Sequence, residues 1–210
     1  MRIVVTGATS FIGLAVIENL LHGGHEVLAV ARPDSPGRKM LEGRKGIRIL
    51  TCGLDHIGNL TDPLVLAGRP DGPGGSGAAR GADAWLHLGW EGAGSANRQN
   101  PQLQARNIGY ALESLRTAAA IGCTRFLFSG SQAEYGIYRT VMKEDGVCSP
   151  VSEYGKDKLE VCRRASEEAE RLGITYIHAR IFSVYGPGDH PWSLVSTCID
   201  TFLRGGHMEM

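Results

Sequence analysis

The sequence lacks an excess of charge of either sign, because its 22 lysine and arginine residues balance 22 aspartate and glutamate residues. Without surplus positive charge it has little to attract a nucleic-acid backbone or an anionic membrane surface, so neither is an expected partner. It also lacks any apolar run near the roughly 20 residues that a membrane-spanning helix requires. The N-terminus, Met1 to Gly7, shows no signal-peptide pattern. We therefore expect a soluble cytoplasmic protein.

Cysteine pairs are missing as well. The five cysteines are odd in number, widely scattered and never arranged as C-x-x-C (Cys52, Cys123, Cys148, Cys162, Cys198). Structural zinc sites and redox disulfides normally need such close pairs. We expect free thiols and no metal site.

The chain has 210 residues, of which 42% are hydrophobic, so it is long enough to bury one full core. Runs of strand length alternate with helical patterns, which favours an α/β fold with a parallel sheet and helices on both faces. The strands are predicted at 2–6, 26–31, 47–51, 84–89, 125–129 and 175–181, and helices at 11–21, 102–120 and 153–172. The segment from Gly68 to Gly81 is rich in glycine and proline and is predicted to be a surface loop.

The first strand is joined to the first helix by Thr6-Gly7-Ala8-Thr9-Ser10-Phe11-Ile12-Gly13. Free backbone N–H groups and the helix dipole at such a junction favour a pyrophosphate, as in the Rossmann arrangement. The alternative is an ordinary strand-to-helix turn. The residues expected to contact a dinucleotide here are Gly7, Thr9, Ser10, Phe11, Ile12 and Gly13. Ser10 could cap the helix or donate its hydroxyl to a phosphate oxygen.

The end of the second strand carries Arg32 where an NAD enzyme would carry an acidic residue for the adenosine ribose. A guanidinium suits a 2′-phosphate, so NADP(H) is the preferred cofactor. Asp34 is a rival acidic candidate that leaves NAD(H) open, and Arg32 could equally be a solvated surface charge.

A candidate acid–base pair follows in Tyr154-Gly155-Lys156-Asp157-Lys158, a Y-x-x-x-K pattern. Residues four apart on a helix lie on one face, with Cβ atoms about 6 Å apart. A phenol with a pKa of about 10 needs a neighbouring cation to act near neutral pH, and Lys158 would supply one to Tyr154. Taken alone, the pattern also occurs in ordinary surface helices.

Together with Phe126 to Gly136, these motifs resemble the extended short-chain dehydrogenase/reductases, the NAD(P)-dependent epimerase/dehydratase family. The resemblance implies a Rossmann-type doubly wound parallel sheet. It also implies that Ser131 joins Tyr154 and Lys158 as a catalytic residue, and that Tyr154 and Lys158 contact the cofactor as well. Gly7 to Gly13 resembles the family's T-G-x-x-G-x-x-G turn, with Ser10 in place of the middle glycine.

The resemblance extends over nearly the whole chain and implies further contacts. The cofactor would be bound also by Leu54, Leu88, Gly89, Asn107 and Phe182, and the substrate by Trp90, Ser131, Gln132 and Ser183. Ser183 replaces the family's substrate-binding asparagine in the motif Arg180 to Gly188. For His87, a packed histidine at a strand end is favoured over a catalytic base.

The family's dehydratases carry an Asp-Glu pair after the catalytic hydroxyl residue, where this chain has Gln132 and Ala133. An amide and a methyl group cannot transfer protons, which disfavours dehydration. The resemblance therefore implies a nucleoside-diphosphate sugar as partner and a 4-epimerase or a 4-keto-6-deoxy sugar reductase as activity. The alternative is a catalytically impaired NADP(H)-binding redox sensor or scaffold.

The predicted domains are a dinucleotide-binding, catalytic domain at 1–182 and the start of a substrate-binding region at 183–210. Family members continue well beyond this point, so we expect a truncated substrate subdomain, with cofactor binding but inefficient turnover. Relatives commonly pair as homodimers through the helix carrying Tyr154 and a neighbouring one, and the resemblance extends that expectation to this chain.

Overall fold

The computed structural model describes residues 1–62, 66, 81–191 and 193–208 of the chain. These form two compact units, Met1–Arg180 and Ile181–Met210. Apart from Gly81, the loop predicted at 68–81 lies outside the described residues. Within the described ranges, no helix is long and apolar enough to cross a membrane.

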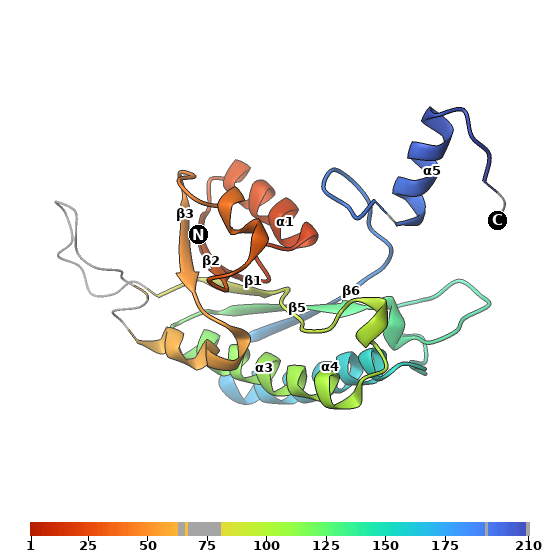
Figure 1. Cartoon of the computed structure of the whole chain (residues 1–210). Coiled ribbons are helices and arrows are strands. Elements are labelled where there is room, and N and C mark those ends of the chain that lie inside the picture. The colour runs from red at the N-terminus through yellow and green to blue at the C-terminus, as the bar shows by residue number, and fades with distance from the viewer. Residues whose placement is uncertain (63–65, 67–80, 192, 209–210) are drawn as a thin grey trace. The chain divides into compact units, whose positions relative to one another are not determined.

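A six-stranded sheet forms the centre of the first unit (Figure 1). In chain order its strands are β1 (Arg2–Thr6), β2 (Glu26–Ala31), β3 (Ile47–Thr51), β4 (Ala84–His87), β5 (Arg125–Ser131) and β6 (Thr175–Ile181). The spatial order is β3-β2-β1-β4-β5-β6, and the registers from β3 to β5 are parallel. This order confirms the predicted Rossmann-type sheet. Strands β2 and β3 are added on one side of β1, and β4, β5 and β6 on the other side. Folds of this type bind ligands at the carboxyl ends of the strands, at the point where the order of addition changes side.

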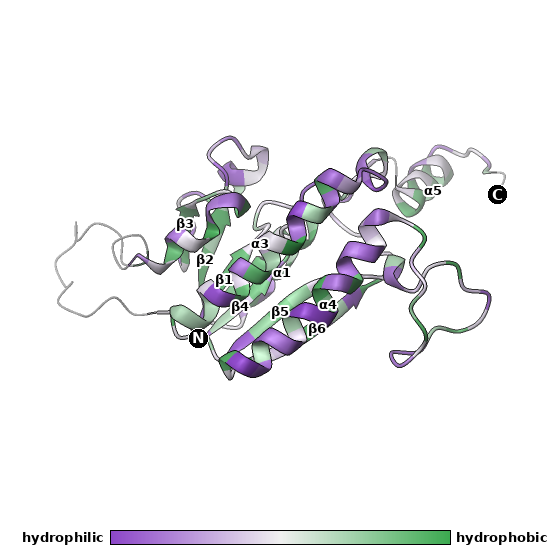
Figure 2. Ribbon diagram, turned by 90° about the horizontal axis from the view of Figure 1, so that it is seen from below, coloured by the Kyte–Doolittle hydropathy of each residue, from purple (hydrophilic) through white to green (hydrophobic). Residues whose placement is uncertain are grey.

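Helices cover both faces of this sheet. Helix α1 (Phe11–His22) lies on one face, while α3 (Pro101–Ala120) and α4 (Glu153–Leu172) lie side by side on the other (Figures 1 and 2). Short 3-10 helices follow β2, β3, β4 and β5, namely η1 (Pro36–Met40), η2 (Leu54–Thr61), η3 (Ser95–Asn97) and η4 (Gln132–Glu134). The second unit contains α5 (Leu194–Leu203), which begins after the N-cap Ser193.

The strand residues alternate between two buried clusters, as a sheet covered on both faces requires. Ile3 and Val5 of β1 pack on the side of α1 with Ile17, whereas Val4 packs with Trp85 on the other side. Helix α4 matches this arrangement with a narrow buried stripe spaced three and four residues apart. Its outward side is mainly hydrophilic (Figure 2).

Aromatic rings stack across β4, β5 and β6. His87, Phe128 and His178 form one row, with successive ring centroids 5.7 and 5.4 Å apart. Trp90 meets Phe128 edge to face at 6.0 Å and meets Tyr154 in the same way at 5.7 Å. This chain of contacts fixes the start of α4 against the carboxyl ends of the strands.

Candidate active site

The turn after β1 depends on two glycines. Gly7 has a φ of 65°, and a Cβ added there would lie 2.7 Å from the backbone nitrogen of Gly89. A Cβ on Gly13 would lie 2.2 Å from the carbonyl oxygen of Gly7. Because no side chain fits at either position, the turn packs directly against the end of β4 and the start of α1.

Ser10 is the N-cap of α1. Its Oγ accepts a hydrogen bond from the Gly13 N–H at 3.0 Å. Of the two roles that the sequence left open, the structure shows the cap, and the hydroxyl keeps its own proton to donate. Thr9 is tied to the segment after β2, since its Oγ1 lies 2.6 Å from Ser35 Oγ. Phe11 and Ile12 are half-buried in the first turn of α1.

The residues expected at the adenosine end lie at the ends of β2 and β3. Arg32 is exposed directly after β2, and Asp34 is exposed close behind it. Arg38 of η1 donates from Nη1 to Thr51 Oγ1 at 3.0 Å, which brings a second guanidinium to the end of β3. Leu54 begins η2 and borders Gly89, where an added Cβ would meet it at 3.0 Å.

The loop after β4 is held by two buried amides of α3. Gln104 Oε1 accepts a hydrogen bond from the Trp90 indole N–H at 2.7 Å. Asn107 Oδ1 accepts from the Glu91 N–H at 2.7 Å, and its Nδ2 donates to the Glu91 carbonyl at 3.1 Å. Asn107 therefore shapes the loop that carries Trp90. Gln104, which no sequence motif singled out, holds the Trp90 ring.

Ser131 and Tyr154 come together from different elements. Ser131 ends β5, Tyr154 lies on the first turn of α4, and the Ser131 side chain lowers the pKa of the Tyr154 phenol. Helix α4 begins there because Ser152 caps it, accepting from the Gly155 N–H at 3.1 Å. Tyr154 is buried with 8% of its surface exposed, while the neighbouring Gln132 is exposed.

Lys158 lies one turn after Tyr154 on the buried side of α4. Its Nζ donates to the Ser129 carbonyl at 2.5 Å and lies 4.1 Å from the Trp90 ring centroid and 5.5 Å from that of Tyr154. Burial lowers the pKa of Lys158 to about 7, and the negative charge of Glu134 opposes this change. An ammonium has three donors, and Ser129 is the hydrogen-bond acceptor that the described residues give it, so donors remain for a bound ligand.

The electrostatic surroundings of Tyr154 are mixed. Burial raises the pKa of Tyr154 above its usual value, while the Ser131 hydrogen bond and the positive charge of Arg98 lower it. The Arg98 guanidinium lies 5.1 Å from the Tyr154 ring centroid. The Arg98 carbonyl accepts the Tyr154 N–H at 3.0 Å, so the loop before α3 and the start of α4 are joined at this point.

His87 is packed within the sheet. Its Nδ1 lies 3.1 Å from Thr6 Oγ1, and its ring stacks on Phe126 and Phe128. Burial, together with the positive charge of Lys158, lowers the pKa of His87 to about 3. A neutral, enclosed ring agrees with the packed role that the sequence favoured.

Glu134 belongs to this site, although the sequence did not single it out. It is fully buried, accepts the Ser131 N–H at 2.7 Å and pairs with Arg180 of β6 at 2.8 Å. The available signal was the S-x-x-E spacing of Ser131 and Glu134, which is typical of a capping box. A Cβ on Gly130 of β5 would lie 2.7 Å from Glu134 Oε1, which is the kind of close approach that selects glycine in a strand.

Other predicted residues lie apart from this cluster in the chain. Leu88 is half-buried and packs with the residues on the α1 side of the sheet. Phe182 and Ser183 are exposed in the second unit. Among the described residues, no group of three or more histidine, cysteine or acidic side chains could hold a metal ion.

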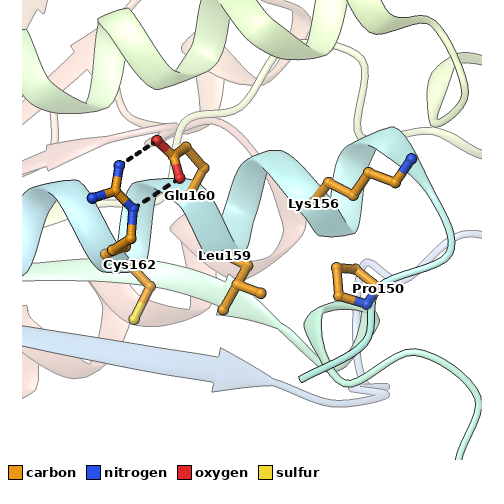
Figure 3. A pocket seen from close by; sticks show the side chains of 6 residues that line it. Pro150, Lys156, Leu159, Glu160 and Cys162 are labelled. Carbon is orange, nitrogen blue, oxygen red and sulfur yellow. Dashed lines mark hydrogen bonds and ion pairs between the residues drawn. The ribbon is translucent and has the colours of Figure 1, made fainter. Parts of the chain in front are cut away.

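A pocket of about 460 Å³ lies on the outer side of α4 (Figure 3). It is lined by Pro150, Lys156, Leu159, Glu160, Cys162 and Arg163. Helical spacing turns Lys156, Glu160 and Arg163 away from Tyr154 and Lys158, whereas Cys162, four residues after Lys158, lies on the same side of the helix as Lys158. The pocket lining includes none of Ser131, Tyr154 and Lys158.

The strand order and the glycine turn after β1 define a Rossmann-type dinucleotide-binding fold. The chain belongs to the NAD dependent epimerase/dehydratase family, whose sequence model matches residues 3–210. This membership confirms the resemblance seen in the motifs.

Curated relatives include nucleotide-sugar enzymes. The chain is 25% identical over 214 residues to the ADP-L-glycero-D-manno-heptose-6-epimerase of Pseudomonas aeruginosa, covering 100% of this chain and 60% of that protein. It is 26% identical over 155 residues to the dTDP-6-deoxy-L-talose 4-dehydrogenase (NAD(+)) of Aggregatibacter actinomycetemcomitans, covering 74% of this chain and 50% of the relative.

Solved structures also match this chain over nearly its whole length. MoeE5 in complex with UDP-glucose and NAD is 27% identical, with a TM-score of 0.75 over 98% of this chain and 62% of that chain. The UDP-glucose 4-epimerase of Thermotoga maritima is 22% identical, with a TM-score of 0.79 over 100% of this chain and 65% of that chain, and it shows the shared fold. The chain thus spans between half and two thirds of the length of these four proteins.

Proposed function

We propose that this chain is an NAD(P)-dependent oxidoreductase or epimerase that acts on a nucleoside-diphosphate sugar by hydride transfer at a sugar carbon. The activity is that of a 4-epimerase or a 4-keto-6-deoxy sugar reductase. The observation that carries the proposal is the cluster of Ser131, Tyr154 and Lys158 at the edge of the sheet where the β1–α1 turn also lies. Gly7 of that turn abuts Gly89, and the adjacent Trp90 contacts Tyr154.

The residues present fit a dinucleotide. The glycine turn leaves backbone N–H groups at the start of α1 for a pyrophosphate, and Lys158 has ammonium donors available for ribose hydroxyls. A bound nicotinamide would accept hydride from the sugar or supply hydride to it. Gly7, Thr9, Ser10, Phe11, Ile12 and Gly13 would hold the pyrophosphate side, and Leu54, Leu88, Gly89 and Lys158 would border the remainder.

Within this arrangement the protein moves one proton. Ser131 donates a hydrogen bond that orients the sugar oxygen, and Tyr154 takes the hydroxyl proton or returns it. The positive charges of Lys158 and Arg98 stabilise the phenolate that forms, because both lie within 5.5 Å of the Tyr154 ring centroid. An epimerase uses both directions of transfer, and a reductase uses only the return of the proton.

Elimination of water is not part of the proposal. Gln132 is exposed beside Ser131 and Ala133 follows it, so neither position offers an acid or base. Trp90, Gln132 and Ser131 are the proposed substrate contacts of the first unit.

The test begins with a fluorescence titration with NADPH and NADH, followed by incubation with nucleoside-diphosphate sugars and product analysis. Tyr154→Phe is expected to lower sugar conversion by about 100-fold or more, because it removes the acid–base group, and its cofactor affinity is measured in the same titration. Tyr138→Phe is the matched control, since that phenol donates to the Val147 carbonyl outside the cluster.

Product analysis also separates the two activities. Interconversion without net cofactor consumption identifies an epimerase, and stoichiometric loss of NADPH identifies a reductase. If the chain binds a dinucleotide but converts none of these sugars, or if Tyr154→Phe is fully active, the proposal is wrong and a sensor or scaffold role gains support.

A further inference from the structure

Glu134 is a buried carboxylate placed directly behind Ser131. Its side chain is 0% exposed and accepts three kinds of donor: the Ser131 N–H at 2.7 Å, His178 Nε2 at 2.9 Å and Arg180 Nε at 2.8 Å. A buried carboxylate is costly unless its oxygens are paired and hydrogen-bonded, and here both oxygens have partners. Burial raises the pKa of Glu134, but the bonds from His178, Arg180 and Ser131 outweigh it and hold the pKa below its usual value.

The backbone makes room for this carboxylate at one position. A Cβ on Gly130 would lie 2.4 Å from His178 Nε2 and 2.7 Å from Glu134 Oε1. Gly130 therefore permits the imidazole and the carboxylate to pass close to β5. The same strand presents Ser131 at its next residue, so this network ends at the proposed catalytic hydroxyl.

Glu134 and Ser131 form a reciprocal capping box. Ser131 Oγ accepts the Ala133 N–H at 3.1 Å, while the Glu134 carboxylate accepts the Ser131 N–H. With Oγ engaged as an acceptor, the Ser131 proton is free to be donated toward Tyr154 or a sugar oxygen. The orientation of the hydroxyl thus depends on a backbone position that Glu134 secures.

We propose that Glu134 is a positioning residue that fixes the Ser131 hydroxyl beside Tyr154. The inference rests on the proposed function of that cluster. The competing interpretation is that Glu134 only joins β5 to β6 through His178 and Arg180, with no effect on Ser131.

The direction in which the Tyr154 pKa changes when Glu134 is removed distinguishes the two interpretations. The groups that act on Tyr154 are Ser131 at the end of β5, Glu134 on η4, Arg98 in the loop before α3 and Lys158 on α4. The Ser131 hydrogen bond lowers the pKa of Tyr154, and the Glu134 charge raises it to a lesser degree. If Glu134 acts only as a charge, removing it lowers the pKa. If it holds Ser131, removing it raises the pKa.

The experiment uses the full chain labelled with fluorotyrosine, whose lower phenol pKa permits titration by fluorine NMR, with the Tyr154 signal assigned from Tyr154→Phe. Glu134→Met, similar in size but without an acceptor, is expected to shift the Tyr154 pKa upward. Glu134→Gln keeps an oxygen for the Ser131 N–H and is expected to shift it downward. In a Ser131→Ala background, Glu134→Met should no longer cause an upward shift.

Gly130→Ala provides a second route if Glu134→Met does not fold. It retains every charge but forces the carboxylate away, so it too is expected to raise the Tyr154 pKa. Downward shifts in both Glu134→Met and Glu134→Gln, no shift in either, or an unchanged upward shift without Ser131, would overturn the inference.

Single-turnover sugar conversion supplies the activity measurement. Glu134→Met is expected to lower the rate by about 10- to 100-fold, as a misplaced catalytic group does, whereas Glu134→Gln retains most of it. Arg180→Met is the control that loosens β6 and leaves the Ser131 contact in place, and it should lower thermal stability with little effect on the rate. If the unmodified chain converts no sugar, the proposed function fails, and the titration alone decides the role of Glu134.

Discussion

At the scale of single residues, burial controls the charge state of Lys158. Its side chain is 2% exposed and lies against the rings of Trp90 and Phe128. The interaction of the ammonium with these rings recovers part of the lost hydration, but burial still lowers the Lys158 pKa to about 7. The protein therefore holds this proton weakly before any ligand contributes.

Lys158→Met is expected to stabilise the protein most at and below pH 7, and progressively less as the pH rises from 7 to 10.5. The folded pKa of about 7 lies below the usual 10.5, so between these values the unfolded chain binds more protons and the stability of the unmodified protein rises with pH. Because one pKa unit corresponds to about 1.4 kcal/mol, the difference near pH 7 is on the order of 3 to 5 kcal/mol. Chemical denaturation of both proteins across this range measures it.

Lys156→Met is the matched control for that prediction. Lys156 lies two residues earlier on α4, is exposed and makes a surface ion pair with Glu153. Exposed pairs contribute about 0 to 1 kcal/mol, so the free energy of unfolding of this variant should stay close to that of the unmodified protein at every pH. If the difference in free energy of unfolding between Lys158→Met and the unmodified protein did not change between pH 7 and 10.5, the lowered pKa of Lys158 would be contradicted.

Arg32 carries the proposed preference for NADP(H). Arg32→Gln is expected to weaken NADPH binding by about 10- to 100-fold, the value of a charge-assisted hydrogen bond to a phosphate, and to leave NADH binding nearly unchanged. Fluorescence titration measures both affinities, with Arg106→Gln on α3 as the control for losing an exposed arginine. Equal affinities for the two cofactors in the unmodified protein would instead favour NAD(H) and a role for Asp34.

Helical spacing predicted Tyr154 and Lys158 as a pair, and the family resemblance added Ser131 to them. Glu134, Arg98 and Gln104 were missed. Their contacts reach residues 46, 56 and 14 positions away in sequence, respectively. No short-range pattern reports such contacts, since they exist only after the strands and helices have packed.

At the scale of elements, boundaries were predictable where a side chain caps a helix. Ser152 and Gly173 bound α4, and Asn100 with Pro101 begins α3, all as local chemistry favours. Strand β5 continues two residues beyond its predicted end, through Gly130 to Ser131. Its extension accompanies the contact of Gly130 with the Glu134 and His178 side chains, which local propensity does not report.

Two glycines in helices are expected to respond oppositely to alanine. Gly13→Ala would place its Cβ 2.2 Å from the Gly7 carbonyl oxygen, so it should lower stability and abolish dinucleotide binding. Gly109 of α3 is exposed, with nothing within 4 Å of an added Cβ, so Gly109→Ala should raise the free energy of unfolding by about 0.5 to 1 kcal/mol.

Thermal denaturation and NADPH titration of the two variants measure this contrast. Retained cofactor affinity in Gly13→Ala would mean that the β1–α1 turn does not form the pyrophosphate site. A loss of stability in Gly109→Ala would show that α3 is packed against a neighbour at that position.

At the scale of the whole molecule, the first unit contains the glycine turn and the proposed catalytic cluster together. The 210-residue chain is therefore expected to bind NADPH or NADH. Its sugar turnover is expected to be inefficient, because it spans 62% of MoeE5 and 60% of the heptose epimerase. Comparing steady-state rates with those of a full-length relative tests this, and a comparable rate would show that these residues suffice.

The sequence by itself determined the fold class, the order of elements and the candidate Ser131–Tyr154–Lys158 cluster, because periodicity, caps and short motifs are local properties of the chain. Only the tertiary structure decided how the cluster is charged and held. The lowered pKa of Lys158, the Arg98 charge above Tyr154 and the Glu134 carboxylate behind Ser131 all arise from burial and from contacts between distant segments. Electrostatic energies depend on distance and dielectric surroundings, which the linear order of residues does not contain.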